Sequence, residues 1–241
     1  MHDSHSRRVV CLGASIVRGQ VSTNIVNLLN QRMRKHGFQF INAGVNGDLA
    51  YNVSMRLNAV VDKQPDFIII LVGTNDVIGA LVPRLAKWYH RSKRLPQLPT
   101  EQWYCDNILK IVHYLKQNTR AKIALASLPV LGENLTSTFN KTIDTYNGHL
   151  KEIAAQEQVG YLPVHERQQE YLTRTQPAGR DFDGEGRLTQ GLLIRHYLLR
   201  QSFDTISKKY GYVLVTDGIH MNSRGASFII EEIESFLLAN A

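Results

Sequence analysis

The sequence predicts an α/β fold, a three-layer α/β/α sandwich built on a central parallel sheet. Short runs of β-branched and apolar residues recur along the chain. Between these runs lie segments whose apolar residues have the spacing of one buried helix face. This alternation is typical of successive strand–helix–strand units, whose strands align in parallel.

The pattern places the expected elements in chain order. Strands are expected at residues 8–12, 38–42, 66–72, 122–127, 160–164 and 212–216. A first helix follows the first strand, because the apolar residues from Val21 to Met33 keep the spacing of one buried face. Further helices are expected at 50–62, 101–118, 137–158 and 223–239.

Two segments depart from this rhythm and are candidate caps over a site. Segment 79–100 holds three prolines among basic residues, and segment 165–209 is too long for an ordinary connection between a helix and a strand. The spacing of Leu188, Leu192 and Phe203 suggests helix in the second segment. Since neither segment has the composition of a linker, residues 1–241 are expected to form a single domain.

Composition indicates a folded globular protein: 43% of its 241 residues are hydrophobic and 20% are charged. The two cysteines, Cys11 and Cys105, form neither a disulfide framework nor a metal-type spacing. The apolar stretch after Arg8 is too short for a signal peptide, and no run is long enough to span a membrane. We therefore expect a cytoplasmic protein.

The excess of basic over acidic residues indicates which partners the chain could attract. A formal charge of +7 raises the local concentration of anions. The arginines of segment 165–209 and the run from Arg84 to Arg94 are either a solvated face or a means of attracting an anionic substrate. No motif supports a nucleic-acid partner, and the oligomeric state stays open.

Polar clusters follow the first three expected strands. They are Gly13 to Ser15, Asn42 to Asp48 and Gly73 to Asp76. Ligands bind outside the carboxyl ends of the strands in open α/β sheets, so Ser15, Gly47 and Asn75 are expected to line one pocket. Taken singly, each has a plainer interpretation, since serine and asparagine commonly cap helices and glycines form turns.

A fourth cluster places a carboxylate three residues before an imidazole, ahead of the last expected helix. Asp217 can accept a hydrogen bond from one ring nitrogen of His220 and leave the other nitrogen free to act as a base. The alternative is that Asp217 caps the last helix while His220 has a structural role.

These four clusters, in this order, resemble the SGNH or GDSL hydrolases, and the resemblance covers nearly the whole chain. The matching blocks are Gly13-Ala14-Ser15-Ile16, Asn42 to Asp48, Gly73-Thr74-Asn75-Asp76 and Asp217 to His220, with Ser127-Leu128-Pro129 and Tyr146-Asn147 between them. The resemblance implies a flavodoxin-like sheet and a serine esterase that needs no cofactor.

The same resemblance implies the roles of the site residues. Ser15 would attack an acyl carbonyl, His220 would move the proton, and Asp217 would orient the imidazole. The backbone N–H groups of Ser15 and Gly47 and the amide of Asn75 would form the oxyanion hole. The substrate would be a small-molecule ester or thioester, lipid or acetylated.

Two positions depart from the family pattern. Ala14 stands where the family usually has aspartate, which puts the polar bracing of the turn in doubt. Met221 stands where proline commonly follows the histidine, and proline there would only stiffen the turn. Ala14 leaves a catalytically weakened binding module on the same fold as one alternative to an esterase. An acyltransferase is the other alternative, if segment 165–209 forms a lid that excludes water from the acyl-enzyme.

Other site classes have less support. Asp181, Asp183 and Glu185 imitate the start of a calcium loop, but Leu192 stands where the loop needs a bidentate glutamate. The remaining histidines lack ligand spacing, so no metal is expected. A dinucleotide-binding motif is absent as well, because Gly13 and Gly19 do not have its spacing.

Overall fold

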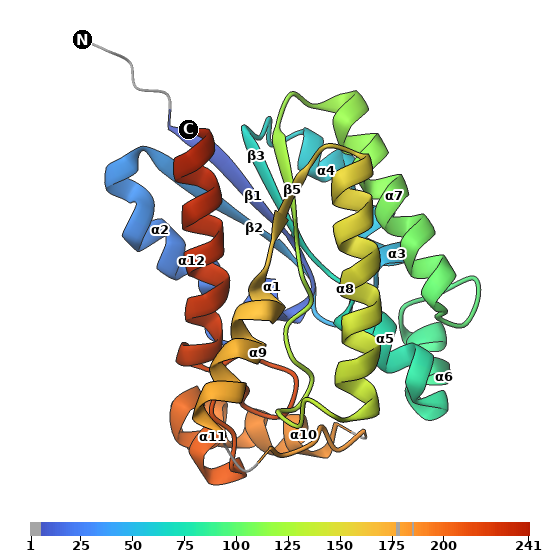
Figure 1. The fold of residues 1–241 in the computed structure, drawn as a ribbon, viewed down its shortest axis with the longest axis vertical. Helices are drawn as coiled ribbons and strands as arrows, with labels where there is room; N and C mark the ends of the chain where they lie inside the picture. The colour runs from blue at the N-terminus through green and yellow to red at the C-terminus, as the bar shows by residue number, and fades with distance from the viewer. Residues whose placement is uncertain (1–5, 177–178, 185) are drawn as a thin grey trace.

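The computed structural model describes residues 6–176, 179–184 and 186–241. Five parallel strands form one sheet in the order β2-β1-β3-β4-β5. The strands are β1 (Arg7–Gly13), β2 (Phe38–Gly44), β3 (Phe67–Leu71), β4 (Lys122–Ala126) and β5 (Gly160–Leu162). Helices cover both faces of the sheet (Figure 1). The predicted three-layer α/β/α fold is confirmed.

The helices alternate with the strands along the chain. They are α1 (Ser15–Arg18), α2 (Ile25–Met33), α3 (Ala50–Ser54), α4 (Asn58–Val61), α5 (Thr74–Leu81), α6 (Pro83–Ser92), α7 (Glu101–Asn118), α8 (Thr138–Gln156), α9 (Val164–Thr175), α10 (Arg187–Leu193), α11 (Phe203–Tyr210) and α12 (Ser223–Asn240). A 3₁₀ turn, η1 (Arg34–His36), extends α2, and a π-helical turn, η2 (Ile194–Leu198), extends α10.

The side chains of each strand pack into two hydrophobic cores, because successive side chains point to opposite faces of the sheet. Val9 and Cys11 of β1 pack into the core under α1, α2, α9 and α12. Val10 and Leu12 pack into the core under α3, α5, α7 and α8. A parallel sheet that is buried on both faces explains why its strands read as continuous apolar runs.

The strand order creates the place for a site. From β1 the chain goes to β2 on one side and then to β3 on the other side of β1. The connections therefore diverge at the carboxyl ends of β1 and β3, which leaves a crevice there. Ser15 begins α1 directly after β1, and Asn75 lies in the first turn of α5, the helix after β3, so both lie at this crevice.

The prediction of a strand at residues 212–216 was wrong. Residues 212–216 make a single antiparallel bridge, between Val215 and Met221, and do not join the sheet. The backbone N–H groups of residues 213–215 donate to the carboxylate of Glu133 and not to a neighbouring strand. The apolar, β-branched sequence of this run predicts a strand, but in the structure a side chain accepts the backbone N–H groups that a neighbouring strand would have bound.

Three other segments differ in detail from expectation. The helix expected at 50–62 is two short helices, α3 and α4, with Arg56 in the break between them. Segment 79–100 contains α6, which packs on α5. Segment 165–209 begins with α9, a helix of the sheet's own layer, before it reaches α10, η2 and α11.

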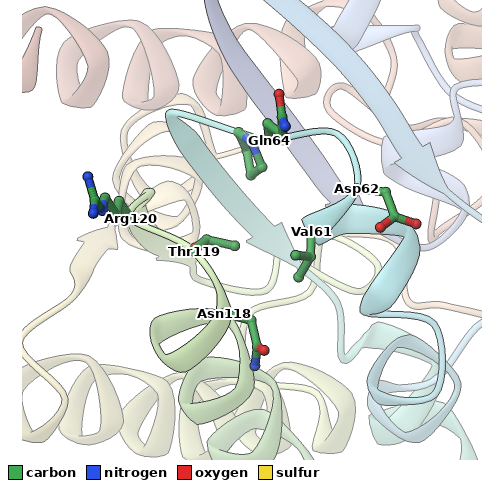
Figure 2. A pocket seen from close by; sticks show the side chains of 7 residues that line it. Val61, Asp62, Gln64, Asn118, Thr119 and Arg120 are labelled. Atoms are coloured by element: carbon green, nitrogen blue, oxygen red, sulfur yellow. The ribbon is translucent and has the colours of Figure 1, made fainter.

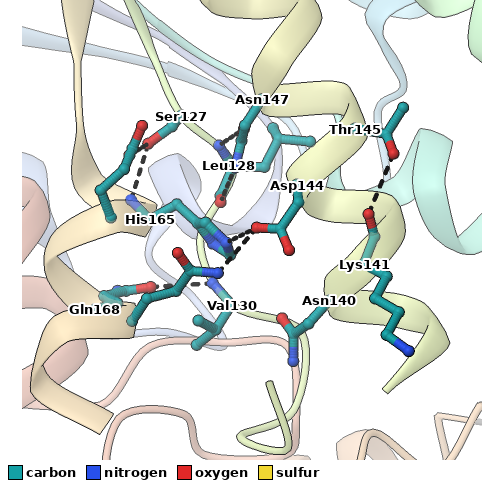
Figure 3. Close-up of polar contacts among 12 residues, drawn as sticks. Ser127, Leu128, Val130, Asn140, Lys141, Asp144, Thr145, Asn147, His165 and Gln168 are labelled. Atoms are coloured by element: carbon teal, nitrogen blue, oxygen red, sulfur yellow. Dashed lines mark hydrogen bonds and ion pairs between the residues drawn. The ribbon is translucent and has the colours of Figure 1, made fainter. Parts of the chain in front are cut away.

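The loop after β4 is held by side-chain amides (Figure 3). Asn147 accepts from the N–H of Leu128 and donates to the carbonyl of the same residue, at 2.6 and 3.1 Å. Gln168 accepts from the N–H of Val130 at 3.0 Å. These contacts explain the polar residues inside buried helix faces, because a buried loop needs partners for its backbone groups.

In the described part of the chain, none of the helices is both long enough and apolar enough to cross a bilayer.

Candidate active site

Ser15, His220 and Asp217 lie in one hydrogen-bonded line at the carboxyl edge of the sheet. His220 Nε2 is 2.9 Å from Ser15 Oγ, and His220 Nδ1 is 2.9 Å from Asp217 Oδ2. All three are buried: Ser15 is 8% exposed, His220 5% and Asp217 0%. An imidazole that faces a carboxylate on one side and a hydroxyl on the other can take the hydroxyl proton.

The carboxylate of Asp217 is charged in spite of its burial. Burial raises its pKa, but the charge of His220 and hydrogen bonds from His220 and Thr189 outweigh that effect, so the pKa lies below its usual value. Thr189 Oγ1 donates at 2.6 Å, and the N–H groups of Ile219 and His220 donate to the other oxygen. The orientation of the carboxylate is therefore fixed from several sides.

A tight loop brings Asp217 and His220 together. The N–H of Thr216 donates to the carbonyl of His220 at 2.6 Å, and Gly218 has a φ of 92°, which favours glycine. Glu133, from the loop after β4, accepts the N–H groups of residues 213–215 at 2.6 to 3.1 Å. Glu133 is 3% exposed, and burial raises its pKa against these donors.

Gly47 and Asn75 meet at the same edge. Gly47 lies in the loop after β2 with a φ of 74°, and Val45 in this loop donates its N–H to the carbonyl of Gly13 at 3.1 Å. Asn75 Nδ2 donates to the carbonyl of Asp48, next to Gly47, at 2.8 Å. Within the described residues, the backbone N–H groups of Ser15 and Gly47 donate to no protein acceptor. These two donors are available to a ligand.

The amide of Asn75 has a fixed orientation. Tyr89 of α6 donates its hydroxyl to Asn75 Oδ1 at 2.8 Å, and both residues are buried. With Oδ1 accepting and one Nδ2 hydrogen bound to Asp48, the second Nδ2 hydrogen is free for a ligand. Segment 79–100 therefore supports the site from the side.

Two cations brace the glycine loop through Asp48. Lys93 Nζ donates to Asp48 Oδ1 at 3.1 Å and to the carbonyl of Asn46, so it bonds to both neighbours of Gly47. Arg56 donates to Asp48 Oδ2 at 2.9 Å and to the carbonyl of Gly13 at 3.0 Å. The guanidinium thus ties the turn after β1 to the loop after β2.

Ala14 leaves the start of α1 without a side-chain cap. Its φ and ψ are −106° and −141°, and the turn is closed by backbone bonds from Arg18 to Ala14 and from Gly19 to Ser15. Arg56 also holds the Gly13 carbonyl in this turn. The turn that carries Ser15 is thus braced by a residue other than the aspartate that the family pattern leads one to expect.

Sequence reasoning identified the residues that meet here but missed those that hold them. Thr189, Glu133, Tyr89, Lys93 and Arg56 each contact a site residue or its loop. Their partners lie 8 to 82 residues away in the chain. No spacing within the sequence signals such contacts.

A second group of serine, histidine and aspartate lies between α8 and α9, and its hydrogen bonds differ from those of the candidate site (Figure 3). His165 Nε2 is 2.8 Å from Asp144 Oδ1, but Ser127 Oγ accepts from the backbone N–H of His165 and not from its ring. Burial lowers the pKa of His165 against the opposing effect of Asp144. Ser127 thus accepts a backbone N–H group in the first turn of α9.

A surface hollow lies at the opposite edge of the sheet (Figure 2). It is lined by Val61, Asp62, Gln64, Pro65, Asn118, Thr119 and Arg120, which precede β3 and β4. It contains no residue of the candidate site. Among the described residues, no group of three or more His, Cys, Asp or Glu side chains is placed to hold a metal ion, and Glu185 of the calcium-like stretch lies outside these residues.

The sequence profile of the GDSL-like lipase/acylhydrolase family matches residues 11–227. The chain belongs to this family. It is therefore an SGNH-type carboxylic ester hydrolase, and the matched residues include every block from Ser15 to His220. No curated protein sequence matches the chain significantly.

Solved structures share the fold of this GDSL-family chain at low identity. The acetyl xylan esterase AlAXEase has a TM-score of 0.68 at 17% identity, over 95% of this chain and 99% of its own. The acetylxylan esterase Axe2 from Geobacillus stearothermophilus has 0.65 at 15%, over 98% and 95%. LAE5, an alpha/beta hydrolase enzyme from the metagenome of Lake Arreo, Spain, has 0.65 at 16%, over 95% and 94%.

Replacing Glu133 with glutamine tests its hold on the loop that carries Asp217 and His220. The variant keeps the volume but loses the charged acceptor of buried N–H groups, which should lower the free energy of unfolding by about 1–3 kcal/mol. We expect a lower kcat with KM retained. Chemical denaturation and ester kinetics measure both effects, and Glu170→Gln, at an exposed position, is the control. Equal stability and kcat in both variants would contradict this role.

Lys93→Met tests the brace on the Gly47 loop. Without the ammonium, the two neighbours of Gly47 lose a shared donor, and we expect kcat to fall about tenfold while KM changes less than about twofold. Lys87→Met, at an exposed position of α6 just before Lys93, is the matched control. A change in KM alone would assign Lys93 to substrate attraction instead.

Asp76→Asn tests a buried acid beside Asn75. Burial raises the pKa of Asp76 to about 8, although the N–H of Ala50 opposes this. The folded state binds this proton more tightly than the unfolded state, and this contributes to the free energy of unfolding. The contribution is fully present below the unfolded-state pKa of about 3.9 and is lost as the pH rises through the folded-state pKa. Urea denaturation from pH 5 to 8.5 should show wild type losing more stability than Asp76→Asn. Parallel curves would contradict the shifted pKa.

Proposed function

We propose that the chain hydrolyses carboxylic esters through Ser15, His220 and Asp217. Ser15 Oγ attacks the acyl carbon as its proton passes to His220 Nε2. The imidazolium then returns this proton to the leaving oxygen or sulfur, and the acyl group stays on Ser15. Water, deprotonated by His220, releases the acid and restores the serine hydroxyl.

The observation that carries this proposal is the 2.9 Å contact on each side of the imidazole. A buried, charged Asp217 stabilises the positive charge that His220 gains in each step. The carboxylate also fixes the tautomer, because it accepts from Nδ1 and leaves Nε2 to face Ser15. A serine-to-alanine variant of the Geobacillus enzyme is described as a catalytic mutant, which supports the same role for Ser15.

The oxyanion hole is proposed to consist of the N–H groups of Ser15 and Gly47 and the Asn75 amide. Negative charge develops on the carbonyl oxygen only as the serine attacks, so fixed donors stabilise the transition state more than the substrate. The bonds from Tyr89 and to Asp48 hold the Asn75 amide before substrate arrives.

The site fits several classes of ester substrate. A short acyl ester, such as an acetylated sugar of the kind named for the xylan esterases, and a lipid ester or thioester all present the same carbonyl. Acyl transfer and a catalytically weakened binder are the alternatives, and Ala14 is the residue that favours the second. The bracing of the Ser15 turn by Arg56 favours an active enzyme.

Graded kinetics test the proposal. Ser15→Ala should lower kcat/KM by on the order of 10³-fold or more, because the attacking atom is removed. Asn75→Ala should lower kcat by about 10²–10³-fold with KM nearly unchanged, because its donor acts on the transition state. Initial rates with acetyl and longer-chain nitrophenyl esters measure both.

Ser92→Ala and Asn118→Ala are the matched controls, since both side chains are exposed. They should keep wild-type rates. Full ester hydrolysis by Ser15→Ala would end the proposal, and a wild-type protein that binds but does not hydrolyse the esters would favour the weakened binder.

A further inference from the structure

An exposed apolar surface lies on the last residue of α10, on η2 and on the residue after η2. Five large hydrophobic residues in a seven-residue stretch are exposed: Leu193 (41%), Ile194 (56%), Tyr197 (59%), Leu198 (75%) and Leu199 (54%). Eleven large hydrophobic residues are exposed in the whole described chain, so nearly half are concentrated here. Scattered exposed leucines are ordinary, but a contiguous patch marks an interaction site. We call these five residues the apolar patch.

The stretch that carries the apolar patch is basic. Residues 186–202 contain Arg187, Arg195 and Arg200 and no acidic residue. Arg200 is exposed, and the guanidinium of Arg195 lies 5.8 Å over the ring of Tyr210. Lys208 and Lys209 of the neighbouring α11 are exposed as well. The surface that would meet a partner is therefore apolar at its centre and cationic around it.

Two of the acids that flank this stretch, Asp204 and Asp183, make hydrogen bonds inside the fold. Asp204 of α11 accepts from the backbone N–H and the hydroxyl of Ser223 at 2.9 and 2.8 Å. Asp183 accepts from the N–H groups at the start of α10. Both carboxylates serve as caps of helix ends, and neither belongs to the stretch that carries the apolar patch.

The apolar patch is connected to the candidate active site by named contacts. Tyr197 donates its hydroxyl to the carbonyl of Gln20 at 2.7 Å, and Gln20 Oε1 accepts from Asn46, beside Gly47, at 2.8 Å. Thr189 of α10 donates to Asp217. The patch thus borders the same edge of the sheet as Ser15, and Figure 1 shows α10 and α11 at this end of the molecule, away from both termini.

We infer that the apolar patch docks the enzyme on a lipid bilayer that carries anionic headgroups. Aliphatic side chains flanked by arginine and lysine are the composition that inserts into the boundary between headgroups and acyl chains. An anionic leaflet attracts each nearby cation, so the arginines orient this edge toward the membrane. The edge that carries Ser15 then faces the lipid surface.

A second copy of the chain fits the charges less well. A twofold contact would set the same patch against itself and bring the arginines of both copies together without an acid from residues 186–202. Like charges placed together oppose association, whereas headgroup phosphates neutralise them. The charge pattern therefore selects the anionic surface.

Vesicle co-sedimentation tests this inference. Wild-type protein should sediment with vesicles that contain phosphatidylglycerol, and much less with vesicles of phosphatidylcholine alone. High salt should weaken the binding, because it screens the headgroup charge. Ser15→Ala should bind like wild type, since docking needs no turnover. A failure of the proposed chemistry is therefore distinguishable from a failure of docking.

Variants separate the apolar patch from general adhesion. Ile194→Ser with Leu198→Ser should lower the partition coefficient about tenfold or more, because two large apolar side chains no longer leave water. Met55→Ser with Leu238→Ser is the matched control: those residues are 62% and 54% exposed elsewhere, and this pair should bind like wild type. Arg200→Gln should weaken binding to phosphatidylglycerol vesicles, whereas Arg120→Gln at the opposite edge should not.

Three results would overturn the inference. The first is that wild-type protein does not sediment with anionic vesicles. The second is that the patch pair and the control pair lose equal amounts of vesicle binding. The third is that the wild type is an oligomer in analytical ultracentrifugation and the Ile194/Leu198 variant is a monomer. The last result would assign the patch to contact between copies. Circular dichroism of each variant verifies that it is folded.

Discussion

The carboxylate of Asp217 accepts four hydrogen bonds in a fully buried position, and the geometry of the candidate site follows from it. A buried charge is costly unless its bonds are complete. Here the donors are the ring and backbone of His220, the backbone of Ile219 and the hydroxyl of Thr189. The same bonds that keep Asp217 ionised therefore fix the imidazole that faces Ser15, so charge burial and orientation depend on one set of contacts.

The loops at this edge are held by ionic side chains from distant parts of the chain. Glu133 satisfies the backbone of the segment before Asp217, while Lys93 and Arg56 converge on Asp48 beside Gly47. Such loops lie beyond the ends of the strands, where no ladder supplies partners for their backbone groups. Side chains with several donors or acceptors take that place. The segments that we expected to be caps contribute to this support through Tyr89, Lys93 and Thr189.

The strand ends were predictable because local patterns determine them. Apolar runs marked five strands, and the polar residues directly after β1, β2 and β3 marked the edge where Ser15, Gly47 and Asn75 lie. The order of the strands brings these residues together, and the family blocks gave Asp217 and His220. The sheet and the candidate residues were therefore predictable from the sequence.

The remaining features depend on tertiary contacts that leave no local pattern. Residues 212–216 have the composition of a strand, yet Glu133 takes the N–H groups that a neighbouring strand would have bound. The turn beside Ala14 lacks its expected carboxylate, and Arg56, 42 residues later in the sequence, braces it instead. The exposed run around Leu198 has helical spacing, but only the structure reveals that it faces outward.

One measurement tests the central claim most directly. The protein is treated with a fluorophosphonate, digested with trypsin and analysed by mass spectrometry. The peptide of residues 9–18 contains a single serine, Ser15, so an adduct can be assigned without ambiguity. The account predicts the phosphonate mass on this peptide, formed at a rate that falls when His220 is replaced by alanine. An unmodified 9–18 peptide from a sample that hydrolyses esters, or an adduct on another serine, would contradict it.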